Sequence, residues 1–310
     1  MLLVLAGSLV TSTDSGLAVP DWPTTYGWNM FTFPPSKWVG GILYEHGHRL
    51  IASTVGMLTI VLAAWLWAKD PRRWLRRLGL VALAAVIVQG VLGGITVLYF
   101  LPTAVSTAHA GLAEIFFCLT VAIALFTSPS WMRGDGRADD HRLRRLATAT
   151  TGLIYTQILI GAAMRHSDAG LAIPDFPLMF GGLLPNRWSA GIAIHFAHRV
   201  GALVVTAGAV ATILHIRRHH RTNSALTRPV ALLAGLLVVQ VSLGAATVLS
   251  GLQVWINSAH VVGGALVLTT SLVITLRTWR IRFALDHAGR TPTSAEAAST
   301  SLPGSIGARA

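Results

Sequence analysis

Long runs of apolar residues, separated by shorter polar segments, are the dominant pattern along this chain. A helix that crosses a lipid bilayer needs about 20 predominantly apolar residues, and most of these runs reach that length. To within a few residues, the apolar segments cover 1–11, 39–67, 78–100, 105–127, 146–165, 190–216, 229–249 and 256–276. The pattern predicts an all-α integral membrane protein with eight transmembrane helices.

Composition supports this interpretation. Of the 310 residues, 53% are hydrophobic and only 12% are charged, and the mean hydropathy is +0.61. Soluble domains carry about 25% charged residues. A large soluble domain is therefore excluded.

The two halves of the chain repeat one another. Residues 14–23, DSGLAVPDWP, recur 154 positions later as DAGLAIPDFP at 168–177. Other matches follow in the same order: His48-Arg49 with His198-Arg199, Gln89 with Gln240, Leu92-Gly93 with Leu243-Gly244, and His109 with His260. Parallel repeats of this kind pack around a pseudo-twofold axis along the membrane normal. We expect an N-terminal four-helix bundle (1–128), a cytoplasmic linker (129–145), a C-terminal four-helix bundle (146–276) and a cytoplasmic tail (277–310).

The first apolar segment is shorter than its counterpart in the second half. At 1.5 Å per residue, residues 1–11 cover only about half of a bilayer. The match of Gly7 with Gly161 places the expected start of this helix roughly ten residues upstream, by comparison with the helix predicted near Leu146. We expect the first helix to be incomplete as given. No basic residues precede the segment, which disfavours a cleaved signal peptide.

The net charge of +12 reflects topology rather than a nucleic-acid partner. The Lys and Arg residues concentrate in alternate segments, at 69–77, 133–145, 217–228 and 277–309. By the positive-inside rule these segments face the cytoplasm. The sequence predicts a multi-pass protein of the cell membrane with cytoplasmic basic loops and C-terminus. After Arg290 the tail lacks apolar periodicity and is expected to be disordered.

Four histidines occupy matching positions inside the predicted spans: His48, His109, His198 and His260. Ionisable residues inside a bilayer are costly and point to function. Each half places its two histidines at one depth on two helices, which is typical of a haem iron held by two histidines. A zinc site is less favoured because neither cysteine nor a repeated acidic ligand lies nearby. Copper remains a minor alternative, and a single histidine is often only a packed, hydrogen-bonded side chain.

The two predicted sites differ at one position. Glu45 lies three residues before His48, where the second half has His195. Residues at i and i+3 share a helix face, so we expect Glu45 to point into the first pocket and to accept protons there. Two roles stay open for Arg49 and Arg199, which either bind haem propionates or extend towards the interface.

Two long outer loops, 13–38 and 167–188, are rich in Gly, Pro, aromatic and Asp residues. They form either a cover over each site or a simple interfacial loop. The pairs Asp14 with Asp21 and Asp168 with Asp175 are expected to cap backbone amides in turns rather than bind a metal. Cys118 is the only cysteine, so an intramolecular disulfide is excluded.

These residues resemble the haem A synthase family, whose members oxidise haem O to haem A for cytochrome oxidase assembly. The resemblance covers nearly the whole chain. It rests on five segments in their order: SGLAVPDWP (15–23), EHGHR (45–49), AHAG (108–111), HFAHR (195–199) and His260. Many bacterial members carry a cysteine pair in the first outer loop. Here Val19 stands where the first of these cysteines is expected.

The resemblance implies a role for each site residue. His198 and His260 would hold a permanent haem b in the C-terminal half, and His48 and His109 would face haem O, the substrate. Glu45 would serve the oxidation of the C8 methyl group of haem O to a formyl group through successive hydroxylations. The predicted catalytic residues are therefore Glu45, His48 and His109. The predicted iron ligands are the four histidines.

Two other functions fit the histidine pattern. A dihaem b-type electron carrier or quinol-linked cytochrome would keep both haems fixed, and a haem transporter would not require Glu45. Besides haem O and lipid, the expected partners are a haem O synthase, by the logic of handing over a hydrophobic intermediate, and an electron acceptor such as a quinone or redox protein. The oligomeric state stays open and includes a homo-oligomer.

Overall fold

The computed structural model describes residues 1–134 and 138–288, and side chains as far as residue 280. In this part of the chain the regular secondary structure is helical. The α-helices are α1 (Leu2–Ser12), α2 (Gly41–Lys69), α3 (Arg73–Leu98), α4 (Thr103–Thr127), α5 (Pro129–Arg133), α6 (His141–His166), α7 (Ala190–His219), α8 (Ser224–Leu249) and α9 (Val254–Ala288). Two short 3₁₀ helices, η1 (Met30–Thr32) and η2 (Pro35–Lys37), lie in the first long loop.

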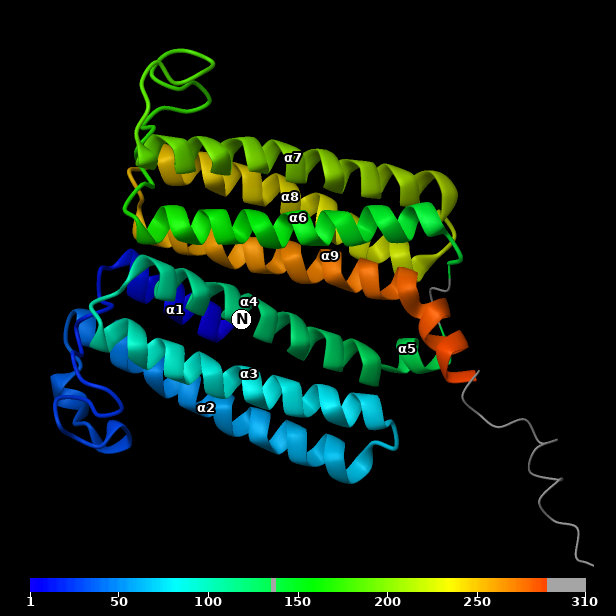
Figure 1. Cartoon of the computed structure of the whole chain (residues 1–310), viewed down its shortest axis with the longest axis horizontal. Helices are drawn as coiled ribbons and strands as arrows, with labels where there is room; N and C mark the ends of the chain where they lie inside the picture. Colours follow the sequence, from blue (N-terminus) through cyan, green and yellow to red (C-terminus); the bar gives the residue numbers. More distant parts are fainter. Residues whose placement is uncertain (135–137, 289–310) are drawn as a thin grey trace, which may run out of the picture.

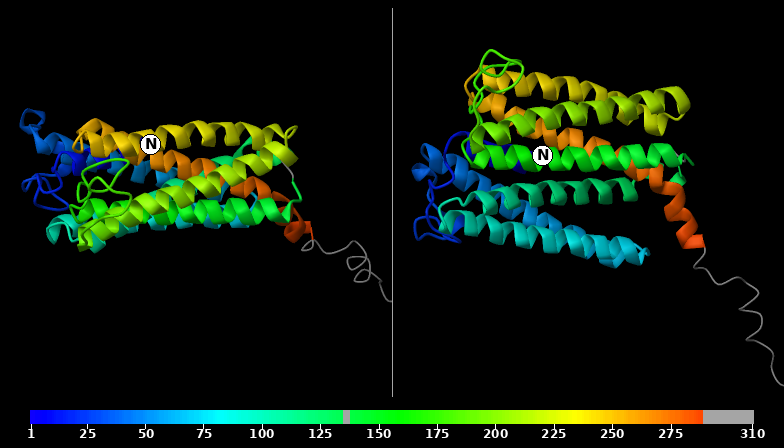
Figure 2. Two further views of the ribbon diagram at one scale, coloured as in Figure 1. Left: turned by 90° about the horizontal axis from the view of Figure 1, so that it is seen from above. Right: turned by 45° about the horizontal axis from the view of Figure 1, so that its top comes forward.

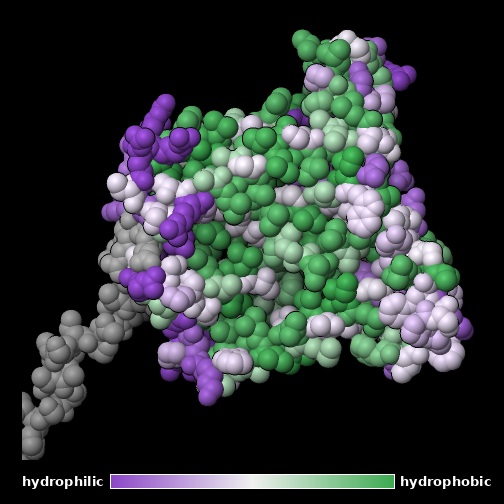
Figure 3. Space-filling view, turned by 180° about the vertical axis from the view of Figure 1, so that it is seen from behind, coloured by the Kyte–Doolittle hydropathy of each residue, from purple (hydrophilic) through white to green (hydrophobic). Residues whose placement is uncertain are grey.

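Seven of the described helices, α2, α3, α4, α6, α7, α8 and α9, are long and apolar enough to cross a membrane. The shorter α1 is also apolar. Large apolar side chains such as Leu58, Trp65 and Val238 point outward, and a broad hydrophobic band crosses the middle of the molecule (Figure 3). Helices satisfy their own backbone hydrogen bonds, as a lipid environment requires. The chain is a multi-pass all-α membrane protein.

The long helices run side by side in two groups (Figure 1). In one group α1 contacts α2, α2 contacts α3 and α3 contacts α4; in the other, α6 contacts α7 and α9, and α8 contacts α7 and α9. Between the groups α1 contacts α9, while α4 contacts both α6 and α9. The two long loops, which precede α2 and α7, lie at the same end of the molecule (Figures 1 and 2).

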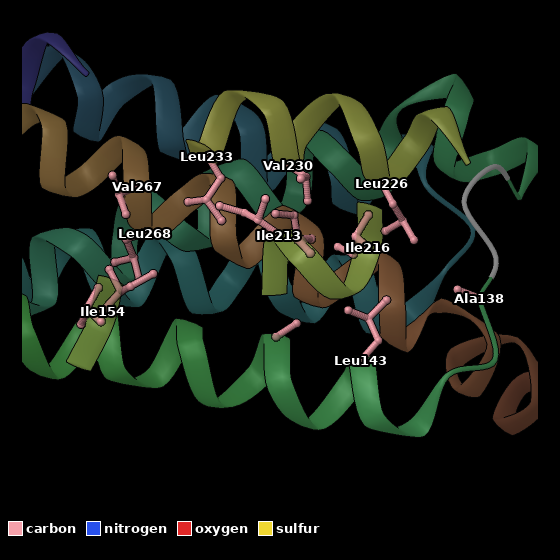
Figure 4. Close-up of a cluster of buried hydrophobic side chains, with 13 residues drawn as sticks. Ala138, Leu143, Ile154, Ile213, Ile216, Leu226, Val230, Leu233, Val267 and Leu268 are labelled. Atoms are coloured by element: carbon pink, nitrogen blue, oxygen red, sulfur yellow. The ribbon is translucent and has the colours of Figure 1, made fainter. Parts of the chain in front are cut away.

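Each group has its own apolar core. In the second group, side chains from α6, α7, α8 and α9 converge, among them Leu143, Ile216, Leu226 and Leu268, all at most 1% exposed (Figure 4). In the first group Leu75, Ala82 and aromatic residues of α4 and α5 form the equivalent cluster. Small polar residues also join helices, as where the Thr151 hydroxyl lies 2.7 Å from that of Ser271. Such contacts are typical of helix packing in membranes.

Local sequence explains several helix ends. The side chain of Asp140 accepts a hydrogen bond from the Leu143 amide at 2.8 Å, and Ser189 accepts one from the Ile192 amide at 3.2 Å. These side chains replace the missing backbone acceptors in the first turns of α6 and α7. The starts of α6 and α7 are fixed in this way, whereas Gly40 at the start of α2 provides no side-chain cap.

The predicted spans match the observed helices to within a few residues, except near the C-terminus. Residues 277–288, predicted as part of the tail, continue α9. The predicted linker contains α5 and the first turn of α6. The predicted disorder after Arg290 falls on residues outside the described part of the chain.

Candidate functional site

The two predicted histidines of the first half each lie against a glycine of the preceding helix. His48 on α2 lies against Gly7 of α1, and His109 on α4 lies against Gly93 of α3. A Cβ atom added at Gly7 or Gly93 would stand 3.1 or 3.2 Å from Cε1 of the ring. A larger residue at either position would displace the imidazole.

The second half repeats this arrangement. His198 on α7 lies against Gly161 of α6, and His260 on α9 lies against Gly244 of α8. Here an added Cβ would stand 2.8 and 3.0 Å from Cε1. All four rings thus depend on a glycine, and the glycines are themselves matched between the halves.

The geometry of the second pair fits a bound haem iron. The ring centroids of His198 and His260 are 6.4 Å apart, and the rings are inclined at 80°. A metal binds an imidazole nitrogen at about 2.0–2.1 Å, so two such bonds plus the ring radii span roughly 6 Å. In addition, Nδ1 of His48, His109 and His260 is buried without a hydrogen-bond partner among the described side chains. Histidine rings with a buried nitrogen that has no hydrogen-bond partner suit the ligation of a haem iron by two histidines.

Glutamine side chains orient two of the histidines. Nε2 of Gln157 donates to the backbone carbonyl of His198 at 2.7 Å and lies 2.9 Å from its Nδ1. Nε2 of Gln89 donates to the carbonyl of His109 at 3.0 Å. The residue that matches Gln157 in the first half is Leu3, so His48 has no equivalent amide beside it. Partners of this kind fix the orientation of metal ligands.

Glu45 connects the first outer loop to α2. Its Oε2 accepts a hydrogen bond from the Val19 amide at 2.7 Å, and its Oε1 forms an ion pair with Arg49 at 2.6 Å. The residue is only 3% exposed. Both carboxylate oxygens therefore have partners, and the position of Glu45 is determined by the loop as well as by the helix.

His195 makes the same two connections in the second half. The Ile173 amide donates to its Nδ1 at 3.3 Å, and Nε of Arg199 lies 3.2 Å from its Nε2. Ile173 matches Val19, and Arg199 matches Arg49. Glu45 and His195 thus share one structural role, and they differ in charge and in the ability to accept a proton.

Arg49 and Arg199 hold the outer loops. The Arg49 guanidinium donates to the carbonyls of Val19, Asp21 and Thr24 at 2.7–3.0 Å. Arg199 donates in the same way to the carbonyls of Ile173, Asp175 and Leu178. In this structure the two guanidinium groups bind the loop backbone, and binding of haem propionates by Arg49 and Arg199 stays a prediction.

Two of the four outer aspartates, Asp21 and Asp175, stabilise turns, as the sequence predicts. The Asp21 carboxylate accepts hydrogen bonds from the amides of Tyr26 and Gly27 at 2.7 and 2.9 Å. Burial acts to raise the pKa of Asp21, but these amides and the Thr24 hydroxyl outweigh it and lower that pKa below its ordinary value. Asp175 accepts two equivalent bonds from the amides of Phe180 and Gly181.

Comparison with known proteins gives a consistent result. The COX15-CtaA family model, described as cytochrome oxidase assembly protein, matches residues 1–272. A "Heme A synthase" of Symbiobacterium thermophilum is 32% identical over 259 residues, which cover 79% of this chain and 80% of that protein. The chain belongs to the haem A synthase family. A "Heme A synthase" of Halalkalibacterium halodurans is 27% identical over 285 residues, covering 89% of this chain and 92% of that protein.

In this member of the haem A synthase family, one histidine near the site is more buried than its sequence position predicts, since it lies off the His48 face of α2 and is expected at the interface. His46 is fully buried under the first loop, with its ring 5.0 Å from Phe33 and 4.8 Å from Trp38. Its Nδ1 lies 3.2 Å from the Thr25 hydroxyl. The second half has Phe196 at this position, so the repeat gave no signal for it.

Proposed function

We propose that the two halves of this haem A synthase divide the work. His48 and His109 in the N-terminal half bind haem O, the substrate, and His198 and His260 in the C-terminal half hold haem b. The family membership makes the chain a haem-dependent oxidoreductase that converts haem O to haem A. The observation that carries the division is the duplicated histidine and glycine arrangement in which Glu45 of the first half is replaced by His195 in the second.

The C-terminal pair is the better candidate for a resident haem. Both of its rings lie within 3.0 Å of an added Cβ on the facing glycine, and Gln157 holds His198 in place. Haem b bound there would supply one-electron transfer. The N-terminal pair lacks the amide beside His48, which suits a site that must release its haem after reaction.

Glu45 is the proposed proton acceptor for the oxidation of the C8 methyl group. Arg49 compensates its charge, which lets a carboxylate exist in a buried position. Protonation at Oε2 would weaken the hydrogen bond from the Val19 amide, because the oxygen of a carboxylic acid is a poorer acceptor than that of a carboxylate. Proton transfer at this atom is therefore coupled to the position of the first outer loop. His195 has the same contacts but no carboxylate, so the C-terminal half lacks this group.

The contacts between the two groups support a pseudo-twofold arrangement of eight spans. If α1 to α4 match α6 to α9, then the contact of α1 with α9 is the counterpart of the contact of α6 with α4. The contact of α4 with α9 joins two helices that match each other, so the exchange of the two halves leaves this contact unchanged. Such pairs arise when two similar bundles are related by an axis between them. The domain boundaries proposed from sequence, 1–128 and 146–276, follow from this interpretation.

The proposed orientation follows from the basic residues. The segments 69–77, 138–145 and 217–228 lie at the end of the molecule opposite the two long loops (Figure 1). By the positive-inside rule, we infer that the four predicted ligand histidines lie towards the outer side of the cell membrane and that the C-terminus is cytoplasmic. A haem O synthase and a quinone or redox protein are the proposed partners, and self-association is compatible with the same arrangement.

Haem extraction followed by mass analysis tests this function. We expect protein purified from cells with a haem O supply to contain haem b together with haem O and haem A. In Glu45→Gln, which keeps an oxygen acceptor for the Val19 amide, haem O should accumulate while haem b is retained. Full haem A formation in this variant would contradict the role of Glu45. Haem b alone in the wild type, with and without haem O, would favour a dihaem electron carrier.

A further inference from the structure

A second group of possible metal ligands lies at the other end of the molecule, between α6 and α7. It consists of Asp140, His215 and His220, whose ligand atoms all lie within 4.8 Å of one another. In the part of the chain that the structure describes, this is the one such group of three. His215 follows His198 by 17 residues on α7, which at 1.5 Å per residue is about 26 Å. The group is therefore separate from the candidate haem sites.

Both imidazoles meet a single oxygen atom. Nε2 of His215 is 2.7 Å from Oδ2 of Asp140, and Nε2 of His220 is 2.9 Å from the same oxygen. The other oxygen, Oδ1, accepts the hydrogen bond from the Leu143 amide that caps α6. The cap fixes the carboxylate, and Oδ2 is left to face the two rings.

The end of α7 brings the two histidines together. Residues five positions apart on a continuous helix do not share a face. His220 is the C-cap of α7 and has left the helical conformation, with φ −131° and ψ 32°. Its ring therefore turns back towards Oδ2. The His215, Asp140 and His220 side chains are 10%, 20% and 18% exposed, so the group is sheltered but accessible to an ion from solution.

We propose that Asp140, His215 and His220 bind a divalent transition-metal ion of the zinc class. Two imidazole nitrogens and one carboxylate oxygen are common Zn²⁺ ligands, with water as the fourth. In a tetrahedral site with bonds of about 2.0–2.2 Å the ligand atoms stand roughly 3.3 Å apart. The two nitrogen–oxygen distances need to open by only a few tenths of an ångström.

The bound ion links the start of α6 to the end of α7. It joins residues 75 and 80 positions apart in the sequence, on the two helices that carry Gly161 and His198. Metal binding to the folded state alone stabilises that state. The ion therefore holds α6 and α7 together at the end of this helix pair that lies away from the proposed haem b site.

The test uses haem-loaded full-length protein in detergent, without a polyhistidine tag and after chelator treatment. Zn²⁺ is titrated against a chromophoric chelator, and Co²⁺ is added separately to record its visible absorption bands. We expect one Zn²⁺ per chain with a tetrahedral Co²⁺ spectrum. In His215→Gln and in His220→Gln the affinity should fall by more than the roughly 10- to 100-fold that loss of an outer partner costs.

His141→Gln is the matched control, because this residue lies beside the group without facing Oδ2, and it should bind Zn²⁺ as the wild type does. His219→Gln controls for an outer contact, since the His219 ring stacks on that of His215 with the centroids 4.5 Å apart, and its affinity should fall by no more than roughly 10- to 100-fold. Asp140→Asn keeps an oxygen for the α6 cap, so it should fold, retain its haem absorption spectrum and lose Zn²⁺ affinity. Wild-type affinity in Asp140→Asn and His220→Gln, equal losses in the controls, or no binding by the wild type at micromolar Zn²⁺ would each overturn the proposal. The last result would leave a hydrogen-bonded Asp–His cluster only.

Discussion

The N-terminal and C-terminal sites are built from matching helices, glycines and loop contacts, yet they differ at the residue three positions before the first histidine. Glu45 and His195 both accept a loop amide, from Val19 and Ile173, and both contact an arginine. The structural role of this position is therefore satisfied by either residue. The exchange alters the charge and the proton affinity at this position, and we propose that this difference gives the two sites different chemistry.

Exchanging these residues should give the largest effect. In Glu45→His the N-terminal half acquires the residue of the C-terminal half, so the loop contact is kept while the carboxylate is lost. We expect haem A formation to fall by about 100- to 10,000-fold, the usual contribution of a positioned acid or base. Product analysis by mass spectrometry measures this. His195→Glu is the control, and it should keep both haem b and activity. A similar loss in both variants would mean that the position acts only through the loop.

The glycines provide the next comparison. In Gly161→Ala the new Cβ would stand 2.8 Å from Cε1 of His198, whereas in Gly7→Ala it would stand 3.1 Å from Cε1 of His48. Overpacking of this kind costs about 1–3 kcal/mol. We expect Gly161→Ala to lose most of its haem b, measured by absorption spectroscopy, and Gly7→Ala to retain it. Gly208→Ala on α7, where the nearest atom is the Thr150 hydroxyl oxygen at 3.2 Å, controls for a general effect on packing. Normal haem b content in Gly161→Ala would contradict the glycine contact.

A smaller effect is expected from the glutamine that orients His198. Gln157→Leu removes the amide that donates to the His198 carbonyl and installs the residue found at the matching position of the first half, Leu3. Loss of an outer partner of a metal ligand usually costs about 10- to 100-fold in affinity. Haem b should dissociate faster to an acceptor such as apomyoglobin. The reverse exchange, Leu3→Gln, lies in the other half and should leave that rate unaltered. Equal dissociation rates in the wild type and both variants would assign Gln157 to packing alone.

The smallest effect on haem content is expected from the arginines that hold the loops. Arg49→Lys removes the branched donor group that reaches three carbonyls and Glu45. Hydrogen bonds involving a charged group contribute about 1.5–3 kcal/mol each, and a lysine retains part of this. We expect a lower thermal unfolding temperature and faster proteolysis in the loop of residues 13–40. Arg199→Lys should act in the same way on residues 167–189. Unchanged proteolysis in both would show that the loops are held by other contacts.

The sequence predicted the helices and the positions of the histidines well, because apolar length and the internal repeat are properties of the chain itself. It matched Gly7 with Gly161, and Gly93 with Gly244, but it gave no indication that each glycine lies against a histidine ring. That contact depends on how neighbouring helices pack. The repeat nevertheless contained the signal, since small residues at matched positions mark close helix contacts in membranes.

The surroundings of Glu45 could not be predicted in the same way. Helix periodicity places Glu45 on the His48 side of α2, but its bond to the Val19 amide joins residues 26 positions apart. This contact depends on the course of a loop that contains no long regular element. The prediction that His46 lies at the interface was wrong, because it rested on the helix face alone, and the matching residue, Phe196, gives no indication of a buried histidine under the first loop.

Haem analysis of His48→Ala beside His198→Ala, each purified with a haem O supply, tests the division of work most directly. We expect His48→Ala to retain about one haem b per chain and to make no haem A. We expect His198→Ala to lose haem b while it still binds haem O. Loss of the same haem in both variants, or haem b bound only through His48, would contradict this division of work.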